Sequence, residues 1–202
     1  MEEIVEGYKI SKYRWVVLAI YMYIVALTQL YWLNFAAIDT YLEEHLQISA
    51  MKVGLLTLVF PLLFLFLSIP SGIIIDKKGY KFGVSIGVIF TGAFALFRLI
   101  NPYSFNVLLI SQIGISIGQP FVLNGITKLS TTWFPKNEEA TAVGLGSLSL
   151  FLGMIIGLGT TPFLVQSLGL NRCYLSTVLW VQLVFQFSLS LQKPGLPLLK
   201  MK

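Results

Sequence analysis

Long runs of apolar residues, separated by short polar segments, dominate this chain from its fifteenth residue onward. About 20 consecutive apolar residues in a helix cross the hydrocarbon core of a bilayer, so each run of this length predicts a membrane span. Six runs qualify: Trp15–Ile38, Val53–Ile75, Phe82–Ile100, Phe105–Thr127, Ala140–Val165 and Tyr174–Leu191. The pattern predicts an all-α membrane protein, with a six-helix domain over 15–191 between an N-terminal segment, 1–14, and a tail, 192–202.

The composition agrees with a lipid environment. Hydrophobic residues make up 56% of the chain and charged residues 11%, and the mean hydropathy is +0.80. A soluble domain carries about 25% charged residues, so this chain could not cover its surface in water. The first run is 24 residues long and lacks a small-residue cleavage site, whereas a signal peptide has an apolar region of about 7–15 residues. We therefore expect it to remain in the membrane.

The basic residues predict the orientation. With the N-terminus in the cytoplasm, eleven of the fourteen Lys and Arg residues fall on the cytoplasmic side, and three, Lys52, Arg98 and Arg172, fall at the outer ends. Such a bias follows the positive-inside rule. The eleven are Lys9, Lys12, Arg14, Lys77, Lys78, Lys81, Lys128, Lys136, Lys193, Lys200 and Lys202. Both termini are predicted to be cytoplasmic and the Asp39–Lys52 segment to be an outer loop. Arg98 is expected to extend toward the lipid headgroups, with substrate contact as the alternative role.

Catalytic and cofactor chemistry has little support. The chain has one histidine, His45 in the outer loop, and one cysteine, Cys173, too few for a His/Cys metal site. Phosphate-binding GxxxxGK[ST] and nucleophile-elbow GxSxG motifs do not occur. Lys and Arg never form a run of five or six, which argues against nucleic-acid binding despite the net charge of +5. We expect a protein of the lipid bilayer that is not an enzyme and carries no cofactor.

The cytoplasmic loop between the second and third spans contains Gly72, Asp76, Lys77, Gly79 and Lys81. A tight turn there needs a glycine that can take positive φ, and its lysines would hold it inside. The spacing also resembles the loop G-x-x-x-D-[RK]-x-G-x-[RK]-[RK] of the major facilitator superfamily, with Phe82 departing at the last position. The resemblance implies half of a twelve-helix fold. It also implies a gating loop in which the glycine permits close helix contact and Asp76 interacts with a helix N-terminus across the two halves.

A closer resemblance covers about residues 13–165. It is carried by Tyr13–Val17, by Trp32 and Asn34, by Gly118–Asn124, by Trp133–Pro135, and by Glu138, Thr141, Ala142, Gly146 and Gly153–Gly157. These segments are similar to the feline leukaemia virus subgroup C receptor-related branch of the superfamily. That branch is associated with haem and, more firmly, with choline and ethanolamine, which implies that Trp32 faces an organic cation and that Gln119 is a binding residue. Leu150 and Phe151 stand where choline-handling members carry Asn and Gln, so an anionic or less polar substrate is equally admissible.

Polar side chains within the spans are costly in lipid and therefore indicate function. Gln29 and Trp32 share a helical face with Tyr21 and Thr28, and Gln119 shares one with Gln112 seven positions earlier. Gln29, Trp32 and Gln119 are the predicted substrate-binding residues, and helix-to-helix hydrogen bonding is the alternative role of the amides. Gly153 and Gly157 form a small-xxx-small pair that is typical of close helix packing.

The predicted function is transport of a small organic solute by alternating access, as a carrier or its N-terminal half. The chain has room for one six-helix half. We expect a fragment or truncated product, a half-size carrier that forms a homodimer, or a scaffold that keeps the fold without transport. No Asp or Glu lies in a span interior, which argues against a proton relay within this half.

Overall fold

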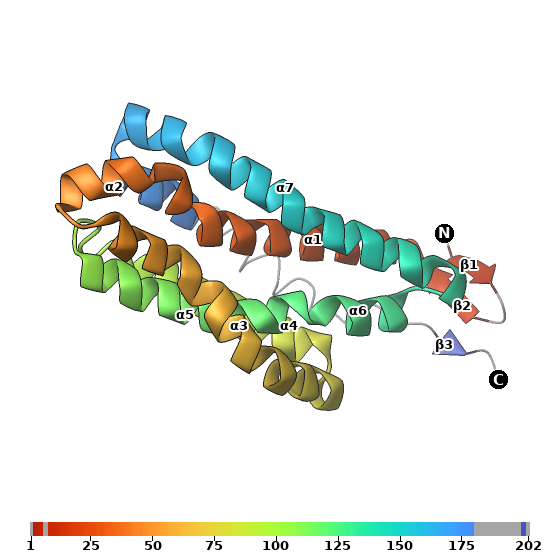
Figure 1. Cartoon of the computed structure of the whole chain (residues 1–202). Helices are drawn as coiled ribbons and strands as arrows, with labels where there is room; N and C mark the ends of the chain where they lie inside the picture. Colours follow the sequence, from red (N-terminus) through yellow and green to blue (C-terminus); the bar gives the residue numbers. More distant parts are fainter. Residues whose placement is uncertain (1, 6–7, 180–198, 201–202) are drawn as a thin grey trace.

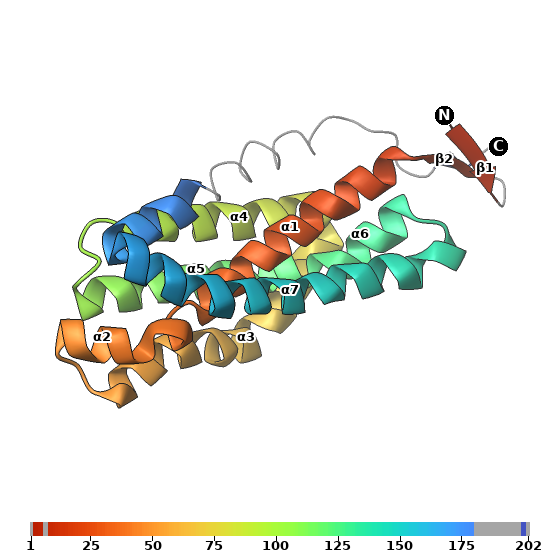
Figure 2. The same ribbon diagram turned by 90° about the horizontal axis from the view of Figure 1, so that it is seen from above.

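The computed structural model describes residues 2–5, 8–179 and 199–200. Its long helices run side by side along one axis (Figure 1 and Figure 2). The elements are β1 (Glu2–Val5), β2 (Tyr8–Ser11), α1 (Tyr13–Leu33), the 3-10 helix η1 (Ala36–Ile38), α2 (Asp39–Leu46), α3 (Ala50–Lys78), α4 (Tyr80–Phe97), α5 (Phe105–Leu123), α6 (Gly125–Trp133), α7 (Lys136–Leu168) and β3 (Leu199–Lys200). Residues 170–179 are also helical.

Five helical segments among the described residues are long and apolar enough to cross a membrane. They are α1, α3, α4, α5 together with α6, and α7. The predicted sixth span, Tyr174–Leu191, begins within the helical residues 170–179, and its remainder lies outside the described residues. Large apolar side chains are exposed along α3 and α7, among them Leu62, Leu65, Phe66, Ile155 and Phe163. An apolar outer surface of this kind suits contact with lipid or with another membrane helix.

Several helix ends follow from local sequence. Lys77 and Lys78 lie in the last turn of α3, and Glu138 and Glu139 lie in the first turn of α7, so each pair complements the helix dipole. Gly79 ends α3 with φ +87°, and its N–H donates to the Ile75 carbonyl at 2.7 Å. The glycine predicted to turn this loop does take a positive φ, which non-glycine residues rarely adopt.

Two segments differ from the expected elements. The Asp39–Lys52 segment, expected to be a loop, contains α2, a short polar helix that buries Leu42. The fourth span divides at Asn124 into α5 and α6, after Pro120, which supplies no backbone N–H to the helix. A search for long apolar runs detects neither feature, because α2 is too polar and the division of α5 from α6 does not change the hydropathy.

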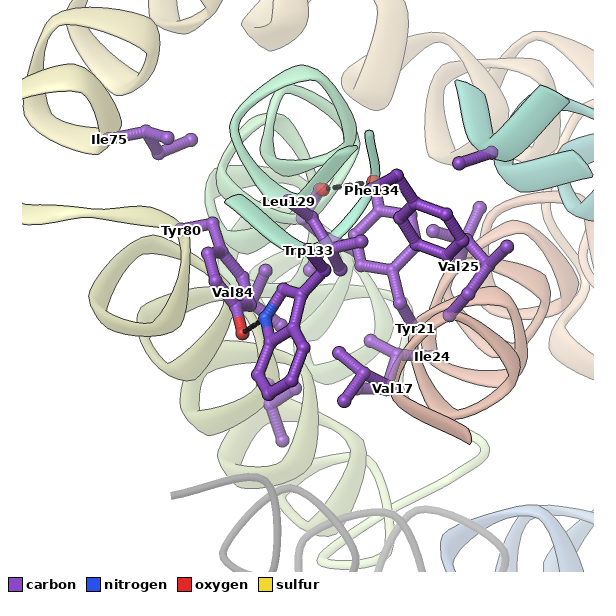
Figure 3. Packing of buried hydrophobic residues seen from close by; sticks show 14 residues of the cluster. Val17, Tyr21, Ile24, Val25, Ile75, Tyr80, Val84, Leu129, Trp133 and Phe134 are labelled. Carbon is purple, nitrogen blue, oxygen red and sulfur yellow. Dashed lines mark hydrogen bonds between the residues drawn. The ribbon is translucent and has the colours of Figure 1, made fainter. Parts of the chain in front are cut away.

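One buried cluster of the bundle is formed mainly by aromatic and aliphatic side chains of α1, α4 and α6, with single residues from α3, α5 and α7 (Figure 3). The Tyr21 hydroxyl donates to the Val122 carbonyl at 2.8 Å, and the Trp133 indole N–H donates to the Tyr80 hydroxyl. These bonds satisfy the polar atoms of large rings within an apolar core. They place α1, α4, α5 and α6 against one another.

The two ends of the chain lie at the same end of the bundle. β2 pairs antiparallel with both β1 and β3, with Tyr8 opposite Lys200. Figure 1 shows these strands at one end, which we call the strand end, and α2 at the opposite end, the α2 end.

Candidate functional site

Three aromatic side chains, Trp32 of α1 and Phe60 and Phe64 of α3, form a row between these two helices. The Trp32 indole N–H donates to the Thr57 carbonyl at 2.9 Å, and its ring meets Phe60 edge-on with centroids 4.7 Å apart. Phe64 continues the row, 5.6 Å from Phe60. Trp32 and Phe64 are half-buried, whereas Phe60 is buried. The hydrogen bond fixes an indole that keeps part of its surface open, and such a ring can attract a cation to its face.

The amides of Gln29 and Gln119 lie deeper. Gln119 Nε2 donates to the Thr28 carbonyl at 2.6 Å, so α5 contacts α1 next to Gln29. Both side chains are fully buried, and Gln119 Oε1 and Gln29 Nε2 have no hydrogen-bond partner among the described residues. The structure therefore places the Gln119 amide at an α1–α5 contact, whereas Trp32 bonds to α3 and the Gln29 amide forms no hydrogen bond with either residue.

The recorded cavities lie elsewhere. One of about 700 Å³ lies at the α2 end between η1, α2 and α7, and one of about 450 Å³ lies between α1, α7 and residues 170–179. Neither is lined by Gln29, Trp32 or Gln119. No group of three His, Cys, Asp or Glu that could hold a metal occurs in the part of the chain that the structure describes. The aromatic row, with Trp32 and Phe64 partly exposed, lies outside both cavities.

The predicted gating loop is presented outward at the strand end. Asp76 and Lys77 are exposed, and Lys81 is half-buried. A Cβ added at Gly72 would meet nothing within 4 Å, so no helix of the described residues approaches this glycine closely. Asp76 lies in the last turn of α3, near the negative end of its dipole, and no hydrogen bond joins it to a helix N-terminus within the described ranges. The contacts implied for this loop would have to come from outside the described residues.

An ion pair between α1 and α7 also lies at the strand end. Arg14 Nε and Nη2 donate to the two carboxylate oxygens of Glu138 at 3.1 and 3.2 Å. Arg14 is 4% exposed, and its guanidinium lies about 6 Å from the rings of Trp15 and Phe134. Sequence reasoning did not pair these residues, although both stand where an apolar span begins. The pair fixes the starts of α1 and α7 relative to each other.

The expectation that Arg98 extends to the lipid headgroups is wrong. Its side chain is fully buried, with Nε donating to Ser111 Oγ at 3.1 Å and Nη2 donating to Gln112 Oε1 at 2.7 Å. Three aromatic rings lie 4.5–5.5 Å from its Cζ, those of Tyr31, Phe35 and Tyr174. Arg98 follows the last residue of α4, and its side chain faces the interior of the bundle. Polar and aromatic side chains there contact the guanidinium in place of the lipid headgroups. Gln112, a polar residue within an apolar span, was the sequence signal of this contact.

Comparison with known proteins gives a family. The family model described as Major Facilitator Superfamily matches residues 18–191. The Choline/ethanolamine transporter FLVCR2 of Rattus norvegicus is 25% identical over 162 residues, covering 79% of this chain and 30% of that protein. The Uncharacterized MFS-type transporter C09D4.1 of Caenorhabditis elegans is 26% identical over 161 residues, covering 79% of this chain and 28% of that protein. The chain thus spans less than a third of the length of these relatives.

A solved structure has the same fold. It is a bacterial homologue of the human lysosomal transporter Spinster in an inward-facing, unoccupied conformation. The TM-score is 0.76 at 19% identity, over 95% of this chain and 45% of that one. The fold class predicted from sequence, half of a major facilitator fold, is confirmed.

Proposed function

Because this chain belongs to the Major Facilitator Superfamily, we propose that it carries a small organic solute across a membrane by alternating access, as the N-terminal half of a carrier. The aromatic row headed by Trp32 is the observation that carries this proposal, because it is a fixed, partly open recognition surface on α1 and α3. Carriers of this architecture bind their substrates near the midplane, between two halves. The face that bears Trp32 is the face on which such a substrate would be enclosed.

An organic cation is the substrate class that this surface favours. An indole attracts an ammonium or quaternary ammonium group through its π face. Relatives of this chain carry the name choline/ethanolamine transporter, which points to the same chemistry. In this proposal Trp32 meets the cationic group. Gln29 and Gln119 serve the polar end of the solute, since each retains an unpartnered amide atom among the described residues.

Uptake by proteoliposomes tests the proposal. The purified 202-residue chain is reconstituted at a density at which a second copy can supply the other half, and choline, ethanolamine and unrelated organic anions are offered separately. We expect uptake of the cations, and we expect Trp32→Leu to lower it about tenfold or more. Loss of a desolvated cation–π contact weakens binding by about 2 kcal/mol, and about 1.4 kcal/mol corresponds to a factor of ten.

Trp15→Leu is the matched control, since Trp15 lies on the same helix and packs on Phe134 instead. It should transport as the wild type does. Failure of the folded, monodisperse wild-type chain to move any offered solute would refute transport by this chain alone and would favour the scaffold alternative.

The loop of Gly72, Asp76, Lys77, Gly79 and Lys81 is proposed to gate the carrier. Its support is geometric: Asp76 is exposed at an unfavourable end of α3, and Gly72 faces open space. A helix N-terminus of a second half would stabilise the Asp76 carboxylate and fill the space beside Gly72. Breaking that contact would open the strand end during the transport cycle.

Asp76→Asn tests gating. We expect a several-fold lower maximal uptake rate with an unchanged half-saturating concentration, because Asp76 would act on the conformational step and not on the solute. Uptake is measured as a function of solute concentration. Glu44→Gln, which removes an exposed carboxylate at the α2 end, should leave both constants unchanged. A higher half-saturating concentration with an unchanged maximal rate would contradict the gating role.

The partner in this proposal is a second six-helix half, supplied by another polypeptide segment or by a second copy of this chain. The exposed apolar side chains of α3 and α7 and the open gating loop support it. We place both termini in the cytoplasm, since eleven of the fourteen basic residues lie on that side of the predicted spans.

A further inference from the structure

Arg98 is buried near the α2 end of the bundle, among polar and aromatic side chains that we call the Arg98 chamber. Residues of three helical segments surround it: Tyr31 on α1, Ser111 and Gln112 on α5, and Tyr174 in the helical stretch 170–179. Arg98 itself directly follows α4. The arginine side chain is fully buried. A guanidinium stays protonated in proteins, so this chamber holds a full positive charge.

The chain offers no carboxylate to balance that charge. Its nine acidic residues are Glu2, Glu3, Glu6, Asp39, Glu43, Glu44, Asp76, Glu138 and Glu139, all outside the apolar spans. Among the residues that the structure describes, no carboxylate forms an ion pair with Arg98. Three aromatic faces stabilise the cation in part. Buried charges in proteins are nevertheless normally paired, because transfer of an unpaired ion out of water is strongly unfavourable.

Several hydrogen-bond donors in the chamber have no acceptor. Arg98 Nη1, Gln112 Nε2 and the Tyr174 hydroxyl are buried and have no partner in the described part of the chain. The first two atoms carry only donor hydrogens. Ser111 Oγ accepts from Nε and Gln112 Oε1 accepts from Nη2, and the buried Tyr31 hydroxyl is also without a partner in that part of the chain. The chamber therefore combines an unpaired positive charge with donor groups that lack an acceptor.

We infer that Arg98, Gln112 and Tyr174 form a binding site for a small monovalent anion of the chloride type. A monovalent ion neutralises the single guanidinium, whereas a divalent ion would leave a net negative charge in an apolar core. The surrounding rings of Tyr31, Phe35 and Tyr174 leave little room for a bulky anion. The ion joins α4, α5 and residues 170–179 at the α2 end, and the site does not depend on the proposed transport function.

Thermal unfolding in defined anions tests the site. The purified chain in detergent is placed in gluconate, and chloride replaces gluconate at constant ionic strength. We expect the midpoint temperature to rise by about 4 °C or more at saturating chloride, because a ligand that binds only the folded state stabilises it. Arg98→Gln should lose this rise. Arg172→Gln, which removes an exposed arginine near the same end, should keep it.

If Arg98→Gln does not fold, equilibrium dialysis with radioactive chloride measures anion binding to the wild-type chain directly. The wild-type chain should bind about one chloride per chain with saturation, and Gln112→Leu, which retains the arginine, should weaken binding about tenfold. No saturable chloride binding by the wild-type chain would overturn the inference. An equal thermal shift in folded Arg98→Gln would overturn it as well.

Discussion

Replacing Gly153 by leucine is expected to force α1 away from α7 and to destabilise the bundle. A Cβ at this position would lie 2.1 Å from the Ala26 carbonyl oxygen and 2.7 Å from the Ala26 Cα. These are backbone atoms of α1, so relief requires movement of a whole helix and not a change of rotamer. Overpacking commonly costs about 1–3 kcal/mol, and we expect the upper end of that range.

Thermal unfolding and size-exclusion chromatography in detergent measure the effect. A loss of about 3 kcal/mol lowers the midpoint temperature by about 6–12 °C in a chain of this size. Gly159→Leu is the matched control, because a Cβ at this exposed position of the same helix would meet nothing within 4 Å. Gly153→Ala should fall between the two. Equal unfolding temperatures for Gly153→Leu and Gly159→Leu would contradict a close α1–α7 contact at Gly153.

The close approach of α1 and α7 was partly readable from sequence. Gly153 and Gly157 mark a face that can pack closely, and both glycines do face α1, at Ala26 and at Leu30. The spacing could not identify which helix approaches, since any neighbour can use a small-residue face. The same limit applies to Gly144 and Gly159, which look alike in sequence but face open space.

Hydropathy predicted the helices because lipid imposes length and apolar character on every span. It failed at α2, where the polar segment Asp39–Leu46 forms a helix outside the apolar runs, and at the Asn124 break, where backbone geometry changes without a change in hydropathy. Both features depend on local backbone hydrogen bonds, which cannot be predicted from a count of apolar residues.

Side-chain environments were the least predictable part of the candidate site. Arg98 was expected to reach the headgroups because arginines near span ends commonly do so, yet Gln112 and Ser111 hold it inside the bundle. Helical periodicity placed Gln29 and Trp32 on one face, but the Trp32 indole bonds to α3, while the Gln119 amide bonds to the α1 backbone at Thr28. Periodicity assigns a face and leaves open which neighbouring helix that face meets.

Replacing Glu138 by methionine is expected to destabilise the strand end by about 3 kcal/mol. Arg14 would then retain its charge at 4% exposure without a carboxylate partner. Removing one member of a buried ion pair commonly costs about 3–5 kcal/mol, and we take the lower end because the Glu138 side chain is 30% exposed. Thermal unfolding in detergent measures the loss, and Glu139→Met, in the same first turn of α7, controls for the helix-dipole contribution.

The double variant Arg14→Met with Glu138→Met distinguishes an unpaired buried charge from lost packing. Replacing both members of a buried pair by apolar residues is often neutral, since neither charge then has to be desolvated. Trp15 and Phe134 already surround Arg14, so a methionine there would contact apolar rings. We therefore expect the double variant to unfold at a higher temperature than Glu138→Met alone. If the destabilisation of the double variant equals the sum for Arg14→Met alone and Glu138→Met alone, the two charges are not coupled. Each side chain would then stabilise the fold through its own packing.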